Sequence, residues 1–181
     1  MTTATLEANA VTAAEHDVPI PYVQRTRDYY LALGFSPYRW AHFVDAPFTP
    51  LATPVRRARV ALITTAAPYQ PGAGDQGPGA AYNAAAKFYT VYSIPAQTEP
   101  DLRISHIGYD RAHTSAKDIN TYFPLARLKE AAAAGRIGAL GPRVHGAPTN
   151  RSQRVTRETD APELLRRCRE DGVDAAILVP T

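Results

Sequence analysis

The stretch that most constrains the fold is the last one, residues 160–181, with the sequence DAPELLRRCREDGVDAAILVPT. Asp160 and Glu163 have the spacing of a capping box, which predicts that a helix starts here. Gly172 is the residue expected where a helix ends in the left-handed conformation. Residues 173–179 are mostly apolar, as in a parallel strand that is covered on both faces. The segment therefore predicts a helix, a tight turn and a buried strand.

The rest of the chain predicts a similar alternation of elements. The pattern favours an α/β fold, a layered and mostly parallel sheet with flanking helices of the Rossmann-like or flavodoxin-like kind. The predicted domains are a loose tail (1–17), a helical and aromatic arm that packs on the main domain (18–57), and the α/β domain (58–181). The other predicted elements are helices over 22–33 and 124–134, strands over 58–65 and 102–108, extended segments over 87–94 and 136–140, and a polar loop over 142–159.

Composition excludes several classes of function. The chain contains 20 Lys and Arg residues and 17 Asp and Glu residues, and the two signs are interspersed along it. We therefore expect no nucleic-acid partner. No apolar run is long enough to span a membrane, and the first residues do not form a signal peptide, so we expect a cytoplasmic protein without a membrane anchor. Cys168 is the single cysteine and lies on the inward face of its helix. A buried structural thiol is favoured over a nucleophile.

Polar side chains follow the predicted strand that begins at residue 102. His106, Asp110 and His113 fall within eight residues, at or just beyond the carboxyl end of that strand. They favour a polar site, with a loop-capping role for Asp110 as the alternative. The spacing matches no strong zinc motif, so no metal is assigned. A metal-dependent hydrolase around the two histidines is the least favoured hypothesis.

Two loops offer further candidates. The glycine-rich loop 66–81 follows a strand, where binding loops occur, and it carries Asp75. Its glycines fit neither the dinucleotide nor the phosphate-binding motif, so it is either a binding loop or a long ordered connection. Asn150, Arg151 and Ser152 lie in the second loop, where an arginine fork suits carboxylate recognition. The alternative is an ordinary surface arginine.

Five segments resemble one family of enzymes. The chain is similar, over roughly residues 18–181, to the glycine/sarcosine/betaine reductase component B and D-proline reductase selenoprotein family. The segments that carry the resemblance are HIGYDRAHT (106–114), DINTYFPLARL (118–128), GRIGAL (135–140), GAPTNRSQR (146–154) and RCREDGVDAAILVPT (167–181).

The resemblance implies an oxidoreductase that cleaves a C–N bond of a small amino-acid-like or betaine-like substrate. In that family a selenocysteine or cysteine follows the strand that corresponds to AAILVP, and a partner subunit supplies a pyruvoyl group. The catalytic residue is thus expected directly after Thr181, and the sequence is interpreted as the N-terminal part of a longer selenoprotein in a homo- or hetero-oligomer. The 181 residues alone are expected to be inactive.

A second hypothesis belongs to a different class. The chain is then a complete, non-catalytic α/β binding or subunit protein. Its loop 66–81 and the loop that carries Asn150 would hold a ligand or a partner.

Overall fold

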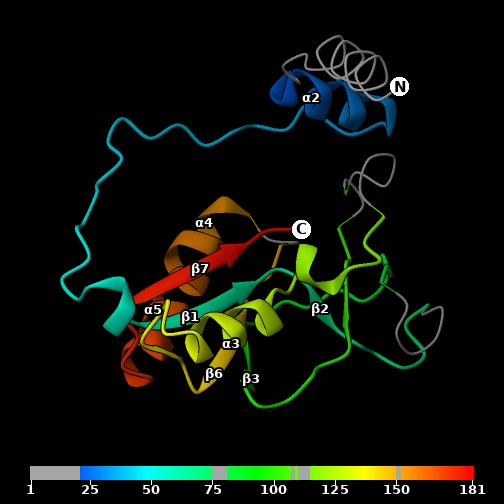
Figure 1. Cartoon of the computed structure of the whole chain (residues 1–181). Coiled ribbons are helices and arrows are strands. Elements are labelled where there is room, and N and C mark those ends of the chain that lie inside the picture. The colour runs from blue at the N-terminus through cyan, green and yellow to red at the C-terminus, as the bar shows by residue number, and fades with distance from the viewer. Residues whose placement is uncertain (1–20, 75–80, 107–108, 110–114, 150–151) are drawn as a thin grey trace, which may run out of the picture. The chain divides into compact units, whose positions relative to one another are not determined.

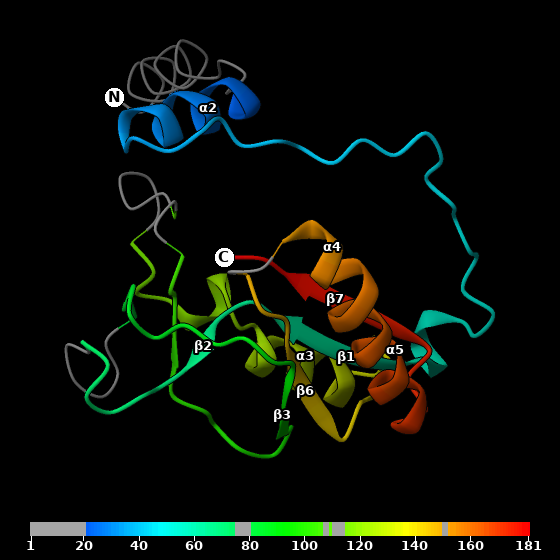
Figure 2. The same ribbon diagram turned by 180° about the vertical axis from the view of Figure 1, so that it is seen from behind.

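The computed structural model describes residues 21–74, 81–106, 109, 115–149 and 152–181. The chain divides into two compact units, Met1–His42 and Phe43–Thr181. Figures 1 and 2 show the chain from two opposite sides.

The described part of the first unit is a helix followed by an aromatic segment. Helix α2 covers Tyr22–Ala32 and ends before Gly34, whose φ of 77° suits a glycine, as predicted. Edge-to-face ring contacts join Tyr22 to Trp40 and Trp40 to Tyr38, at 5.8 and 5.0 Å between ring centroids. None of the α2 residues is buried, so aromatic pairs rather than a core organise this segment.

The second unit is built around strand β1, Arg59–Thr64, which confirms the predicted strand over 58–65. Strands β5 (Ala139–Leu140) and β6 (Arg143–Gly146) run parallel to the first and second halves of β1 on one side. Strand β7 (Ala175–Val179) runs parallel to β1 on the other side, and β3 (Tyr92–Pro95) pairs antiparallel with β6. The predicted α/β class with a mostly parallel sheet is confirmed.

Two extended segments differ from the prediction. The strand expected over 102–108 is only two residues long, β4 (Leu102–Arg103), and pairs antiparallel with β2 (Ala67–Pro68) in a separate small sheet. The polar loop expected over 142–159 instead contains β6 and the start of a helix.

The helix near the C-terminus begins earlier than predicted. It runs through α4 (Gln153–Val155), a π-helical turn η3 (Thr156–Asp160) and α5 (Ala161–Glu170). The backbone at Asp160 is helical and its side chain makes no capping bond, so the predicted capping box is wrong. The Glu163 carboxylate instead binds Arg166 and Arg167 at 2.7 and 2.6 Å.

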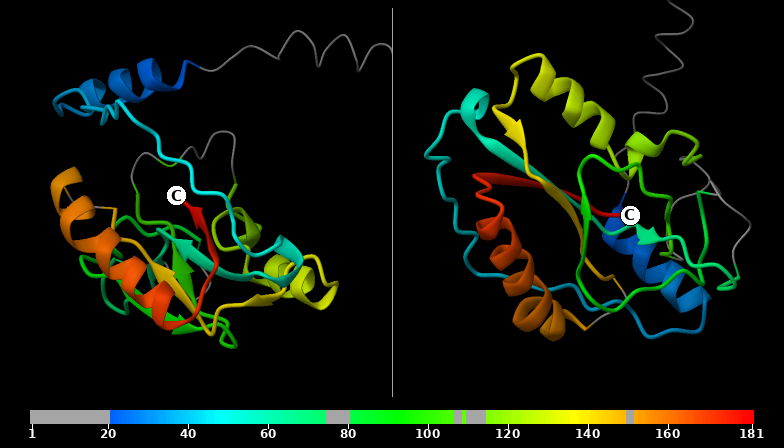
Figure 3. Two further views of the ribbon diagram at one scale, coloured as in Figure 1. Left: turned by 90° about the vertical axis from the view of Figure 1, so that its left-hand side faces the viewer. Right: turned by 90° about the horizontal axis from the view of Figure 1, so that it is seen from below.

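Helices cover both faces of the large sheet (Figure 3). Helix α3 (Leu125–Ala133) buries Leu125 and Leu128 in the cluster that contains Leu62. Helix α5 packs Cys168 against Ala61 and Ile63. Successive residues of a strand point to opposite faces, so α3 and α5 lie on opposite sides of β1.

Strand β7 is the main departure from the predicted burial. It was expected to be covered on both faces, yet Ile177 is 42% exposed and Leu178 58% exposed. Among the described residues, only β1 pairs with β7, so its outer edge has no strand neighbour. The apolar composition that predicted a buried strand thus belongs to an edge strand here.

The short turns η1 (Val55–Arg57) and η2 (Ile119–Thr121) precede β1 and α3. Within the described parts of the chain, no helix has the length and apolar character needed to cross a membrane.

Candidate functional site

The carboxyl end of β1 is the place where the chain reverses its direction of winding. From β1 the chain reaches β5 and β6 through α3 on one side, and it returns through α5 to β7 on the other side. In open α/β sheets a ligand crevice forms outside the carboxyl ends of strands that flank such a reversal. We therefore build the candidate site from this end of the sheet.

Hydrogen bonds fix three segments at this end. Thr65 Oγ1 accepts from the Thr181 amide at 2.7 Å and lies 2.9 Å from Thr181 Oγ1. Thr64 Oγ1 donates to the carbonyl oxygen of Tyr122 at 2.9 Å. The Tyr92 hydroxyl donates to the carbonyl oxygen of Ala66 at 2.7 Å, and burial raises its pKa. The end of β7 and the segment before α3 are thus both held against the end of β1.

A hollow of about 350 Å³ lies beside Tyr122, next to this end of the sheet. Its volume is in the range that accommodates a small metabolite. Five of its eight lining residues are apolar or aromatic, and the other three carry polar side chains. The lining residues are Ala81, Asp101, Leu102, Ser115, Ala116, Lys117, Ile119 and Tyr122.

Asp101 is held in place by a buried arginine. The Arg103 side chain is fully buried and pairs with both carboxylate oxygens of Asp101, while 37% of the Asp101 side chain stays exposed. The Arg103 guanidinium also lies 4.9 Å from the centre of the Tyr69 ring. Burial raises the pKa of Tyr122, the Arg103 charge lowers it and the Asp101 charge raises it, so all three groups are electrostatic neighbours.

A strained turn contributes to the lining of the same hollow. Ala116 has a φ of 54°, which is unfavourable for a residue with a Cβ atom, and it is 7% exposed. Ser115 Oγ accepts from the Lys117 amide at 3.4 Å across the turn. Backbone strain of this kind is concentrated at functional sites, so it supports a functional role for the turn.

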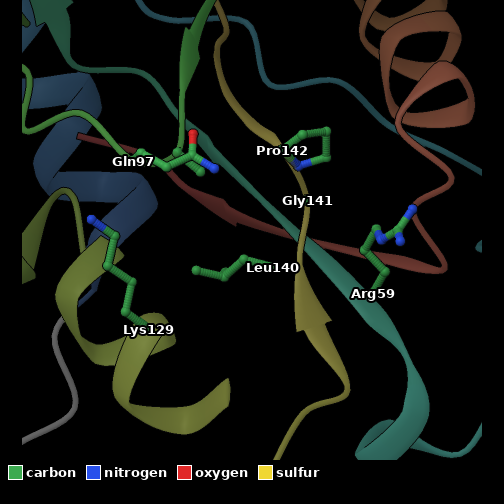
Figure 4. Close-up of a pocket in the computed structure, with 7 residues that line it drawn as sticks. Arg59, Gln97, Lys129, Leu140, Gly141 and Pro142 are labelled. Carbon is green, nitrogen blue, oxygen red and sulfur yellow. The ribbon is translucent and has the colours of Figure 1, made fainter. Parts of the chain in front are cut away.

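A larger hollow of about 680 Å³ lies at the other end of β1. Arg59, Gln97 and Lys129 contribute its polar groups. Figure 4 shows that the Arg59 guanidinium points away from Lys129, and it donates to the carbonyl oxygen of Asp171 at 2.9 Å. The two cations do not converge, and the hollow is at the amino end of β1, so we do not select it as the site.

A buried polar network lies beneath α5. The Asp171 carboxylate accepts from Arg143 Nε at 3.0 and 3.1 Å, and His145 Nε2 lies 3.4 Å from Asp171 Oδ2 without hydrogen-bond alignment. Ser93 Oγ accepts from Arg167 Nη1 at 2.7 Å and lies 2.9 Å from His145 Nδ1. Neither of the two hollows is lined by this serine, histidine or aspartate. The network attaches α5 to β6 and β3.

Two of the predicted site residues lie in described segments. His106 follows β4 and is half-buried, and both burial and the Lys87 charge lower its pKa. Ser152 follows β6 and caps α4, because its side chain accepts from the Val155 amide. Asp75, Asp110, His113, Asn150 and Arg151 lie outside the described residues.

The residues that line the smaller hollow were not predicted from the sequence. Ser115 and Lys117 directly follow the histidine-rich segment that was singled out, and Asp101 precedes the predicted strand. Their closeness in sequence to the histidine-rich segment and to the predicted strand was the signal that could have identified them. A pattern of local elements could not show that residues 101, 115–117 and 122 line one hollow.

Cys168 is 9% exposed and its pKa is raised, chiefly by burial. This confirms that the thiol is buried, as the sequence predicted. Asp118 accepts from the Asn120 amide at 2.9 Å and organises η2 ahead of α3. In the described segments no three His, Cys, Asp or Glu side chains are grouped to hold a metal ion.

Comparison with known proteins places these features in a family. The family described as "Glycine/sarcosine/betaine reductase selenoprotein B" matches residues 38–181. A protein named "D-proline reductase subunit gamma", from Acetoanaerobium sticklandii, is 31% identical over 133 residues. That match covers 72% of this chain and 52% of the relative, so the chain spans about half the length of that relative. No solved structure matches the chain.

Proposed function

Because the chain belongs to the glycine/sarcosine/betaine reductase selenoprotein B family, we propose that it is the part of an amino-acid reductase subunit that positions a small amino-acid-like substrate. One observation carries the proposal: the family match includes the whole large sheet and every residue that lines the hollow at the carboxyl end of β1. The relative's name identifies that protein as a D-proline reductase subunit.

The reaction class is reductive cleavage of a C–N bond. A selenolate or thiolate would supply the nucleophile that bonds to carbon while the amine leaves with the C–N electron pair and takes up a proton. A dithiol donor would then return the carbon as a C–H group and become a disulfide. Activation of the substrate by a pyruvoyl group on a partner subunit is part of the same proposal.

We place the redox residue directly after Thr181, outside these 181 residues. The Thr65 side chain holds the Thr181 amide at 2.7 Å, and the Thr65 amide donates to the Val179 carbonyl oxygen at 3.3 Å. A residue at this position would start from a fixed backbone at the carboxyl end of the sheet, where the hollow also lies. Preorganisation of this kind is what a reacting residue needs.

The exposed edge of β7 supports a further segment of the subunit. Ile177 and Leu178 point to opposite faces of the sheet and are both exposed. A following strand and helices that cover this edge would complete a Rossmann-like or flavodoxin-like sheet. The length of the relative, about half of which has no counterpart here, is consistent with such a segment.

The test is to read the coding sequence directly after codon 181. The proposal predicts a UGA or cysteine codon followed in frame by a second cysteine and another βα pattern. The longer product, with its partner subunit and a dithiol, should then release ammonia or an amine from glycine, sarcosine or glycine betaine, or open the ring of D-proline to give a primary amine. Any other codon, without a downstream reading frame, would contradict the redox proposal and favour a complete, non-catalytic binding or subunit protein.

A further inference from the structure

We infer that Tyr92 is a positioning residue, because its side chain fixes the turn at the end of β1 that holds Thr181. The inference rests on the proposed function for its consequence in catalysis, and it deepens that function by naming a residue that would set the position of the redox segment. It is carried by two contacts of Tyr92, one with Gly146 and one with the carbonyl oxygen of Ala66.

Four strand residues form one row across the carboxyl end of the large sheet. Tyr92 on β3 pairs with Gly146 on β6. Gly146 also pairs with Thr64 on β1, and Thr64 pairs with Val179 on β7. Tyr92 thus lies at one end of the row, and the strand that leads to Thr181 lies at the other end.

Gly146 leaves room for the Tyr92 ring. A Cβ atom added to Gly146 would overlap with ring carbons of Tyr92. The backbone of Gly146 does not have a positive φ, so glycine is needed here for space and not for its conformational freedom. The Phe88 ring packs edge-on against the Tyr92 ring, with 5.1 Å between the ring centroids. These two contacts fix the direction of the tyrosine side chain.

The Tyr92 hydroxyl holds a peptide group next to Thr65. It donates to the carbonyl oxygen of Ala66 at 2.7 Å, and it remains a donor at neutral pH because burial raises the pKa of Tyr92. The Ala66 amide donates to Thr64 Oγ1 at 3.1 Å. Both backbone groups of the fully buried Ala66 are therefore hydrogen-bonded.

Thr65 links this constraint to the end of β7. It lies between Thr64 and Ala66, and its side chain accepts from the Thr181 amide at 2.7 Å. Its own amide donates to the carbonyl oxygen of Val179 at 3.3 Å. Loss of the tyrosine bond would release the Ala66 carbonyl and allow the Thr65 side chain to shift relative to Thr181. Displacements of this kind lower the rate of a reaction whose groups must be aligned.

The first test measures the exchange of the Thr181 amide proton with water, by NMR, in the 181-residue chain. We expect Tyr92→Phe to increase this exchange rate at least about fivefold, because the variant removes only the hydroxyl that holds the turn. Ser93→Ala is the matched control, since it removes a hydrogen-bonded hydroxyl from the same strand and should leave the rate unchanged. An unchanged rate in Tyr92→Phe, or an equal increase in both variants, would overturn the inference.

Gly146→Ala tests the same connection through a different residue. Its Cβ atom would displace the Tyr92 ring, so we expect the Thr181 amide to exchange faster than in the wild type. Adding Tyr92→Phe to Gly146→Ala should give no further increase, because both changes act on one hydrogen bond. A fully additive increase would contradict the assignment. Tyr92→Phe decides the inference alone if Gly146→Ala does not fold.

The second test uses the longer product with its partner subunit. We expect Tyr92→Phe to lower kcat about tenfold and to change KM by less than about twofold, because the redox segment is displaced and the substrate is not. A loss confined to KM, or no loss, would contradict the positioning role. If the wild-type longer product does not cleave its substrate, the proposed reaction fails, and the exchange measurement still decides the role of Tyr92.

Discussion

The two sides of β1 differ in how completely they are closed. On one side β5, β6 and β3 extend the sheet, α3 and α5 cover its faces, and an ionic network ties β6 to the end of α5. On the other side β7 has the apolar composition of an interior strand but leaves Ile177 and Leu178 exposed. The apolar composition of a strand therefore does not by itself determine its burial. Burial also requires that neighbouring strands and helices cover the strand.

The largest expected contrast is between two leucines of this sheet. Leu62 on β1 is 1% exposed and Leu178 on β7 is 58% exposed. Leu62→Ala should lower the free energy of unfolding by about 2–5 kcal/mol, because it leaves a cavity in the core. Leu178→Ala should lower it by less than about 0.5 kcal/mol. Urea unfolding measures both, and equal losses would show that the β7 edge is covered in solution.

A smaller effect is expected from breaking the ionic network on the closed side. The Asp171 side chain is 6% exposed, and its partner Arg143 is 34% exposed, so solvent partly screens the pair. Asp171→Ala should cost about 2 kcal/mol of unfolding free energy, below the range for a fully buried pair. Glu158→Ala, at the exposed ion pair with Arg154, is the control and should cost less than about 0.5 kcal/mol. A loss no larger than the control's would mean that the network does not stabilise this side.

The smallest effect is the pH dependence that the same network should produce. Burial lowers the pKa of His145 below its ordinary value of 6.5, and the charges of Arg143 and Arg167 act in the same direction against Asp171. The unfolded chain therefore binds a proton at a higher pH than the folded chain does, so stability should fall as the pH drops below about 6.5 and level off below the folded-state pKa.

His145→Gln isolates this contribution. The pKa of His106 is also lowered, so the wild-type slope between pH 7 and pH 5 contains both histidines. We expect the variant to show a shallower slope than the wild type in urea unfolding series between pH 7 and pH 5. An unchanged slope would place the titration elsewhere.

Local signals predicted the elements whose structure is decided locally. The strand β1, helices α2 and α3, and the helix ends at Gly34, Gly135 and Gly172 follow from periodicity and from glycines with positive φ. The capping box at Asp160 failed because a serine eight residues earlier already caps a longer helix. A cap signal indicates where a helix can begin, not which of two signals is used.

The missed features are those that depend on distant neighbours. Strand β6 contains a buried histidine that pairs opposite Ile63, and nothing in the segment RVHG indicates that neighbour. The hollow joins residues from three separate segments, and an alanine gives no sign in sequence of a positive φ. The glycine-rich loop 66–81 was placed after the strand over 58–65, and the candidate hollow lies at that same carboxyl end of β1.

The pairing of β1 has a consequence for synthesis of the chain. Val60 pairs with Leu140 and Ala175, so the most buried strand of the sheet meets its first partner 80 residues later and its last partner later still. At about 5–20 residues per second, the ribosome needs roughly 4 to 16 seconds to make those 80 residues. During that interval an apolar, β-prone stretch has no partner strand in the large sheet, which makes nascent-chain aggregation the main hazard and chaperone binding at residues 59–64 the expected protection.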